Sequence, residues 1–123
     1  MVKAIASLML GGAFGAVSRW GIHYWIDSRW GAHHSFPWGI LLVNVAGCFL
    51  FGWLFVLFEN RQWFSDTVQL AVFTGFLGSF TTFSTFGWIT LELLRYGQPG
   101  LALTNIGASV VLGLLAVWAG ILV

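Results

Sequence analysis

The sequence predicts an all-α integral membrane protein whose subunit contains four membrane-spanning helices. Of its 123 residues, 59% are hydrophobic and only 7% are charged, and the mean hydropathy is +0.88. An average soluble domain is about 25% charged, so this chain has too few charges to stay in water. One bilayer crossing takes about 20 apolar residues, which leaves room for at most about four or five crossings.

Charged and turn residues divide the chain into four expected spans within one domain, residues 1–123. We expect these spans at about residues 4–26, 36–58, 67–94 and 101–123. The connecting loops are short, so consecutive helices are expected to be antiparallel neighbours. The first apolar stretch is longer than the apolar core of a signal peptide, and we expect it to remain as a span.

The charge and the cysteine content exclude several other classes of protein. The net charge is +1 without a clustered basic face, so no nucleic-acid partner is expected. Cys48 is alone, which excludes a disulfide framework and a cluster of thiolate metal ligands. No candidate nucleophile, paired carboxylates or metal cluster stands out, so the chain is not expected to be an enzyme.

The basic residues give the chain almost no preferred orientation in the membrane. With four spans, Lys3 and Arg61 fall on one side, whereas Arg29 and Arg95 fall on the other with Arg19 slightly inside its span. The Lys/Arg bias of short loops normally sets orientation. This near tie predicts insertion both ways and antiparallel dimers. The alternative is an orientation set by a feature that the charge count does not reveal.

The third span is unusual in both length and composition. It covers about residues 67–94, more than one crossing requires. Its middle contains Gly75 and Gly78, followed by five hydroxyl residues among seven. Such a stretch is a poor helix centre, because glycine is flexible and Ser and Thr compete for backbone hydrogen bonds. We therefore expect a break near Gly78–Thr82, where freed carbonyls could coordinate a cation.

Asn44 and two phenylalanines are candidate pathway residues. Asn44 lies inside the second span, where an amide must find a partner or face a wet cavity. It could join helices or line a pathway. Phe83 and Phe86 are three apart on one helix face. Their positive ring edges could stabilise a small anion, although ordinary packing would explain them as well.

The first and fourth spans carry the remaining features that membrane burial does not explain. Arg19 could extend to the interface or attract anions in a vestibule. Asn105 and Ser109 lie four apart on one face, which could pack against a helix or line a path. Gly11 and Gly15 form a GxxxG pattern that indicates close helix packing. A subunit this small has little room for its own pathway, so transport would require an oligomer.

Three segments together resemble the Fluc or CrcB family of small bacterial fluoride channels. They are GGAFGAVSR with Arg19, the N-x-x-G of the second span, and the long motif G-F-x-G-x-x-T-T-F-S-T-F that begins at Gly75. The resemblance implies a dual-topology antiparallel homodimer with two fluoride pathways. It further implies passive export of fluoride across the bacterial inner (plasma) membrane, which protects against fluoride toxicity.

The resemblance also implies roles for individual residues. Ring edges and polar side chains would form the fluoride pathway, at Asn44, Thr82, Phe83, Ser84, Thr85, Phe86 and Ser109. Arg19 resembles the family arginine near the end of the first helix, at the vestibule. The backbone carbonyls of Gly78 and Thr81 from both subunits would hold a structural sodium ion at the dimer centre.

Two departures from the family pattern and one rival function are also apparent. Relatives often have an acidic residue soon after the third-span motif, where this chain has Ile89 and then Glu92, and a tyrosine near the position of Asn105. The rival is a small multidrug-type, dual-topology, proton-coupled transporter. That function needs a carboxylate inside the membrane. The first span has none, and Glu92 lies near a span end.

Overall fold

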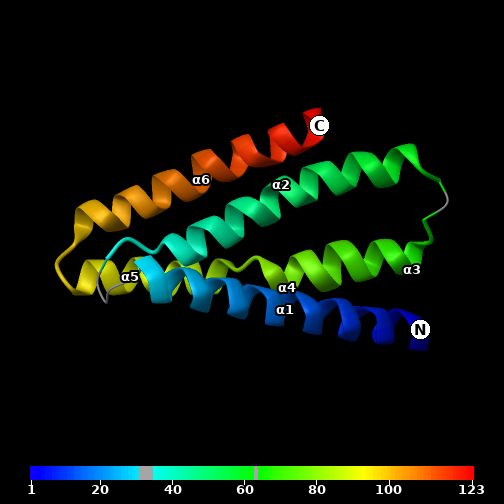
Figure 1. Cartoon of the computed structure of the whole chain (residues 1–123), viewed down its shortest axis with the longest axis horizontal. Coiled ribbons are helices and arrows are strands. Elements are labelled where there is room, and N and C mark those ends of the chain that lie inside the picture. The colour runs from blue at the N-terminus through cyan, green and yellow to red at the C-terminus, as the bar shows by residue number, and fades with distance from the viewer. Residues whose placement is uncertain (31–34, 63) are drawn as a thin grey trace.

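The computed structural model describes residues 1–30, 35–62 and 64–123, and these form four long helical segments (Figure 1). They are α1 (Val2–Trp30), α2 (Trp38–Asn60), a broken third helix within Asp66–Arg95, and α6 (Pro99–Leu122). Each is long and apolar enough to cross a membrane. The described residues contain no strand. The predicted all-α membrane fold is confirmed.

The third helix is built from four pieces. They are α3 (Asp66–Gln69), the π-helix η1 (Leu70–Leu77), α4 (Gly78–Phe80) and α5 (Phe83–Arg95). Between α4 and α5 the backbone is extended at Thr81 (φ −85°, ψ 154°) and Thr82 (φ −150°, ψ 125°). The break therefore lies inside the stretch where the glycines and hydroxyl residues predicted it.

Consecutive helices run in opposite directions, as the short loops predict (Figure 1). The most extensive packing, however, is between α1 and η1 and between α2 and α6. The two helices of each pair run in the same direction (Figure 1). Short loops bring only the helix ends together, whereas close packing in a membrane depends on where the small residues lie.

The GxxxG pattern of α1 is a packing face. A Cβ atom on Gly11 would collide with the Ala71 carbonyl, and one on Gly15 would collide with the Phe76 carbonyl and the Ser79 hydroxyl. The backbones of α1 and the third helix therefore touch directly, as the pattern predicts. This contact fixes the first half of the third helix, up to the break, against α1.

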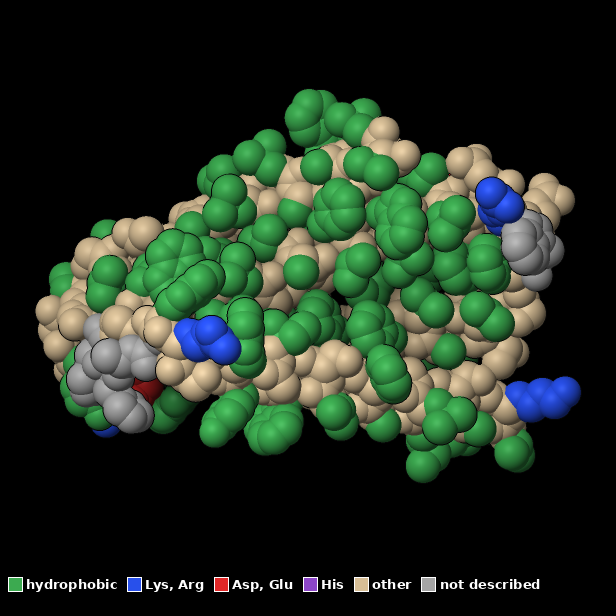
Figure 2. Space-filling model, in the orientation of Figure 1, with side chains coloured by type: hydrophobic (Ala, Val, Ile, Leu, Met, Phe, Trp, Pro, Cys, Tyr) green, Lys and Arg blue, Asp and Glu red, His purple; other side chains and the backbone are tan. Residues whose placement is uncertain are grey.

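The outside of the molecule is apolar. Hydrophobic side chains cover the face seen in Figure 2, and the visible Lys and Arg side chains lie toward its two ends. α1 extends past the expected end of its span to Trp30. A contact between His23 Nε2 and Asp27 Oδ2, 2.6 Å apart, supports this last part, and Arg29 complements the negative end of the helix dipole.

Candidate functional site

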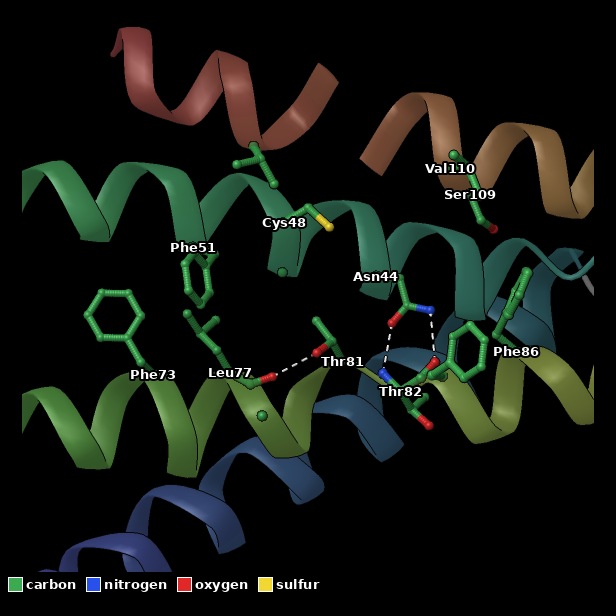
Figure 3. A pocket seen from close by; sticks show the side chains of 14 residues that line it. Asn44, Cys48, Phe51, Phe73, Leu77, Thr81, Thr82, Phe86, Ser109 and Val110 are labelled. Carbon is green, nitrogen blue, oxygen red and sulfur yellow. Dashed lines mark hydrogen bonds between the residues drawn. The ribbon is translucent and has the colours of Figure 1, made fainter. Parts of the chain in front are cut away.

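Asn44 on α2 ties the broken helix in place. The Thr82 N–H donates to Asn44 Oδ1 at 2.9 Å, and Asn44 Nδ2 donates to the Thr82 carbonyl at 3.2 Å (Figure 3). A single amide thus satisfies both backbone groups of an extended residue, which would otherwise be costly inside a membrane. This geometry supports the joining role among the two sequence-based interpretations of Asn44, and its pathway role stays a prediction.

The hydroxyl groups around the break bond mainly to their neighbours. Thr81 Oγ1 donates to the Leu77 carbonyl at 2.9 Å (Figure 3). Thr82 Oγ1 accepts from the Thr85 N–H and donates to Thr85 Oγ1 at 3.2 Å, so Thr82 caps α5. The Ser84 hydroxyl lies 3.4 Å from Thr82 Oγ1. The new helix therefore begins with its free backbone N–H groups partly satisfied.

A groove of about 490 Å³ lies among α2, the third helix and α6. Its lining contains five of the seven expected pathway residues and both expected sodium ligands: Asn44, Thr82, Phe83, Phe86, Ser109, Gly78 and Thr81. Ser84, Thr85 and Arg19 do not line it. The structure thus brings residues from three helices, from Asn44 on α2 to Val117 on α6, around one space.

The two phenylalanine rings of the motif stand together at this groove. The centroids of Phe83 and Phe86 are 5.7 Å apart and the rings are tilted by 41°. Phe83 is 82% exposed within the subunit, whereas Phe80, on the other side of the break, is 4% exposed. Ordinary packing within the subunit therefore accounts for Phe80 and does not account for Phe83.

The polar face predicted on α6 lies against α5. Asn105 is fully buried, and its Nδ2 donates to Thr90 Oγ1 at 3.0 Å. Thr90 Oγ1 in turn donates to the Phe86 carbonyl at 2.7 Å. One turn further along α6, the buried Ser109 hydroxyl has no hydrogen-bond partner in the described part of the chain. The sequence analysis missed Thr90, whose only signal is its position four residues after Phe86.

Arg19 is half-buried on α1, away from the groove lining. Among the described residues it makes no hydrogen bond or ion pair that would hold it in place. Its side chain is therefore available either to reach the membrane surface or to attract anions, and its vestibule role stays a prediction.

All four carboxylates of the chain lie in the first or last turn of a helix: Asp27, Glu59, Asp66 and Glu92. Glu92 Oε1 accepts from Arg95 Nη1 at 3.1 Å in the last turn of α5. Among the described residues no three His, Cys, Asp or Glu side chains gather into a metal site. The groove is lined mostly by apolar and aromatic side chains, together with the Asn44 amide, the hydroxyl groups and the Cys48 thiol, and the described residues that line it include no carboxylate.

Comparison with known proteins identifies the family of this chain. The family described as CrcB-like protein, Camphor Resistance (CrcB), matches residues 6–121. The chain belongs to the CrcB family. A CrcB relative from Acidobacterium capsulatum is 44% identical over 93% of this chain and 90% of its own length. One from Parabacteroides distasonis is 43% identical over 99% and 92%. Both carry the name fluoride-specific ion channel FluC, which confirms the resemblance seen in the motifs.

Proposed function

We propose that this chain forms a fluoride-selective channel, through which fluoride leaves the bacterial cell passively across the inner membrane. This export protects the cell against fluoride toxicity. The observation that carries the proposal is the groove at the helix break, in a membrane chain whose relatives are named fluoride-specific channels. The activity is ion conduction and includes no catalytic step.

The groove offers hydrogen-bond donors in place of the water shell of fluoride. The Asn44 amide has two N–H donors, of which the Thr82 carbonyl takes one. Ser109 lines the groove, and its hydroxyl has no partner among the described residues. The edges of Phe83 and Phe86 add a weak positive potential. Without a fixed charge, these groups bind an anion weakly enough to release it.

Two observations support an antiparallel homodimer. The Lys and Arg residues are divided almost evenly between the two sides, so the chain can insert in either orientation. Phe83 lines the groove and is nevertheless 82% exposed, so one subunit leaves this part of the wall uncovered. A second copy in the opposite orientation would cover it and generate two equivalent fluoride pathways.

A structural sodium ion at the centre of this dimer also fits the residues present. The Thr82 N–H, which would extend the helix by bonding to the Gly78 carbonyl, donates to Asn44 instead. The Gly78 carbonyl thus loses its helical donor, and Thr81 has an extended backbone. Carbonyl oxygens of unwound membrane helices are suitable sodium ligands. Bound there, sodium would hold the two breaks together and add positive potential.

The proposal is tested by anion efflux from proteoliposomes, with a fluoride electrode and a matched chloride measurement. We expect fast fluoride efflux once a potassium ionophore clamps the voltage, with little chloride efflux. Replacing sodium on both sides with a large organic cation is expected to reduce fluoride efflux. A folded protein that releases no fluoride would refute the channel, and efflux independent of sodium would refute the ion site alone.

The rival proton-coupled transporter is not supported by the position of the carboxylates. Exchange of protons for a cation needs an acid within the membrane that loses and regains its proton. Each carboxylate of this chain lies in a terminal helical turn, and Glu92 is paired with Arg95. Proton uptake coupled to the export of a cationic compound would nevertheless support the transporter.

A further inference from the structure

A buried chain of hydrogen bonds joins α6 to α5 directly behind Phe86. Asn105 is 0% exposed and Thr90 is 8% exposed, and these are the buried polar residues of the described chain. The bonds run from Asn105 Nδ2 to Thr90 Oγ1 and from Thr90 Oγ1 to the Phe86 carbonyl. The chain of bonds therefore ends on the backbone of a residue whose ring lines the groove.

The direction of these bonds makes Asn105 the residue that orients the others. The single proton of Thr90 Oγ1 goes to the Phe86 carbonyl, so this oxygen accepts from Asn105. Thr104 provides a contrast on α6, because its hydroxyl also bonds to the carbonyl four residues earlier, that of Gly100 at 2.8 Å. Thr104 is exposed, and within residues 1–30, 35–62 and 64–123 no side chain donates a hydrogen bond to it.

Stability alone does not explain an amide at this position. Asn105 Oδ1 is buried and has no hydrogen-bond partner among the described residues. An unpaired polar atom inside a membrane protein is unfavourable, and an apolar side chain of similar size would avoid it. What the amide adds is direction, because a hydrogen bond fixes the angle and distance between α6 and α5, whereas apolar contact does not.

We propose that Asn105, acting through Thr90, is a positioning residue that holds Phe86 in register with Ser109 at the groove. Ser109 is one helical turn from Asn105 on the same face of α6, and its hydroxyl has no partner. The amide therefore connects the two sides of the groove, the aromatic edge on α5 and the hydroxyl on α6. This inference rests on the proposed fluoride conduction and adds a determinant of its efficiency.

The test compares fluoride efflux among variants that remove or keep the hydrogen bonds. Thr90→Val keeps the shape and removes the hydroxyl, and Asn105→Leu keeps the approximate volume and removes the amide. We expect each to lower fluoride efflux roughly tenfold, as the loss of a buried hydrogen bond implies. The double variant should be no slower than either single one, since both break the same connection. Thr90→Ser, which retains the hydroxyl, should stay within about twofold of the wild type.

Thr104→Val is the matched control, because it removes the same kind of hydroxyl from an exposed site. It should leave efflux unchanged. Size-exclusion chromatography and thermal unfolding should show that all the variants assemble, and Asn105→Leu should unfold no earlier than the wild type. If Thr90→Val does not assemble, the efflux of Asn105→Leu tests the proposal instead, because that variant leaves Thr90 intact.

Three outcomes would overturn the inference while leaving the channel in place. Normal efflux of Asn105→Leu would remove the amide from the mechanism. Equal impairment of Thr90→Ser and Thr90→Val would show that keeping the hydroxyl does not keep the efflux, so that the fit of the whole side chain matters and its hydrogen bonds do not. Multiplied losses in the double variant would show that the two residues act separately. Failure of the proposed function is distinct, because the wild type itself would then release no fluoride.

Discussion

The third helix is joined to its neighbours in different ways on the two sides of its break. Before the break, Gly75 packs against the backbone of Gly11 and Gly12, and the Ser79 hydroxyl lies 2.8 Å from the Gly12 carbonyl. After the break, the described hydrogen bonds to other helices come from side chains, with Asn44 bonded to Thr82 and Asn105 to Thr90.

This difference separates the half of the helix that packs on α1 from the half that α2 and α6 hold through single hydrogen bonds. Close backbone contact gives a rigid and extensive interface, and it leaves no room for an ion. Directional bonds from single side chains hold α5 at a few points and leave space between them. The exposure of Phe80 (4%) and Phe83 (82%), three residues apart, marks where one arrangement gives way to the other.

The largest expected effect is that of Asn44→Leu, which removes the amide that joins the two halves. Both backbone groups of Thr82 lose their partner, and each unsatisfied group costs about 1–3 kcal/mol. We expect fluoride efflux to fall by roughly a hundredfold or more and thermal stability to decrease. Asn60→Leu, at the exposed end of α2, is the control and should have neither effect. Normal efflux of Asn44→Leu would show that the extended backbone at the break keeps its conformation without the Asn44 hydrogen bonds.

A smaller effect is expected when the close packing of α2 against the side chains at the break is disturbed. A Cβ atom on Gly47 would collide with the Thr81 methyl group and approach the Phe80 ring. Overpacking of this kind typically costs about 1–3 kcal/mol, so Gly47→Ala should unfold at a lower temperature. Gly107→Ala is the matched control, since a Cβ atom there meets nothing within 4 Å. Equal stability of the two variants would mean that α2 does not pack closely against Thr81 and Phe80 at the break.

Phe83→Ala tests whether the exposed half conducts. The ring is largely free within the subunit, so the subunit should still fold, whereas loss of the aromatic edge should slow fluoride efflux roughly tenfold. The control is Phe55→Ala, which removes an exposed ring from α2 that does not line the groove. Unchanged efflux in Phe83→Ala would remove this ring from the pathway.

The smallest expected effect is that of Ser109→Ala, and it should separate conduction from stability. The variant removes a donor from the groove and should lower fluoride efflux by about threefold. It also removes a buried hydroxyl without a partner, so thermal stability should be unchanged or slightly higher. Ser7→Ala, which removes a hydroxyl bonded to the Lys3 carbonyl at the far end of α1, should leave efflux unchanged. A parallel loss of both properties in Ser109→Ala would indicate a structural hydroxyl.

The sequence was sufficient for the four helices and for the break, because hydropathy, glycines and hydroxyl residues act locally. It was not sufficient for the partner of Asn44, which lies 38 residues away and depends on how α2 packs. Ser84 and Thr85 were expected in the pathway, and they lie outside the groove of the subunit. Helical periodicity explains this, because residues 83 and 86 share a face that residues 84 and 85 do not.

Asn105 shows the same limit at the other end of the groove. Its position on one face with Ser109 followed from their spacing, whereas its partner Thr90 did not. A threonine on a helix usually bonds to its own backbone, as Thr104 does, and gives no sign of a second contact. Only the packing of α6 on α5 brings the amide to this hydroxyl.

The π-helix from Leu70 to Leu77 lies just before the break, so the number of residues in it determines how the break faces the neighbouring helices. A π-helix places more residues in each turn than an α-helix does. Deleting or inserting one residue there would change this winding and with it the direction in which the residues after it face α1 and α2. Asn44 would then face a different residue of the break. Natural variants of this chain should therefore tolerate substitutions in this segment far better than insertions or deletions.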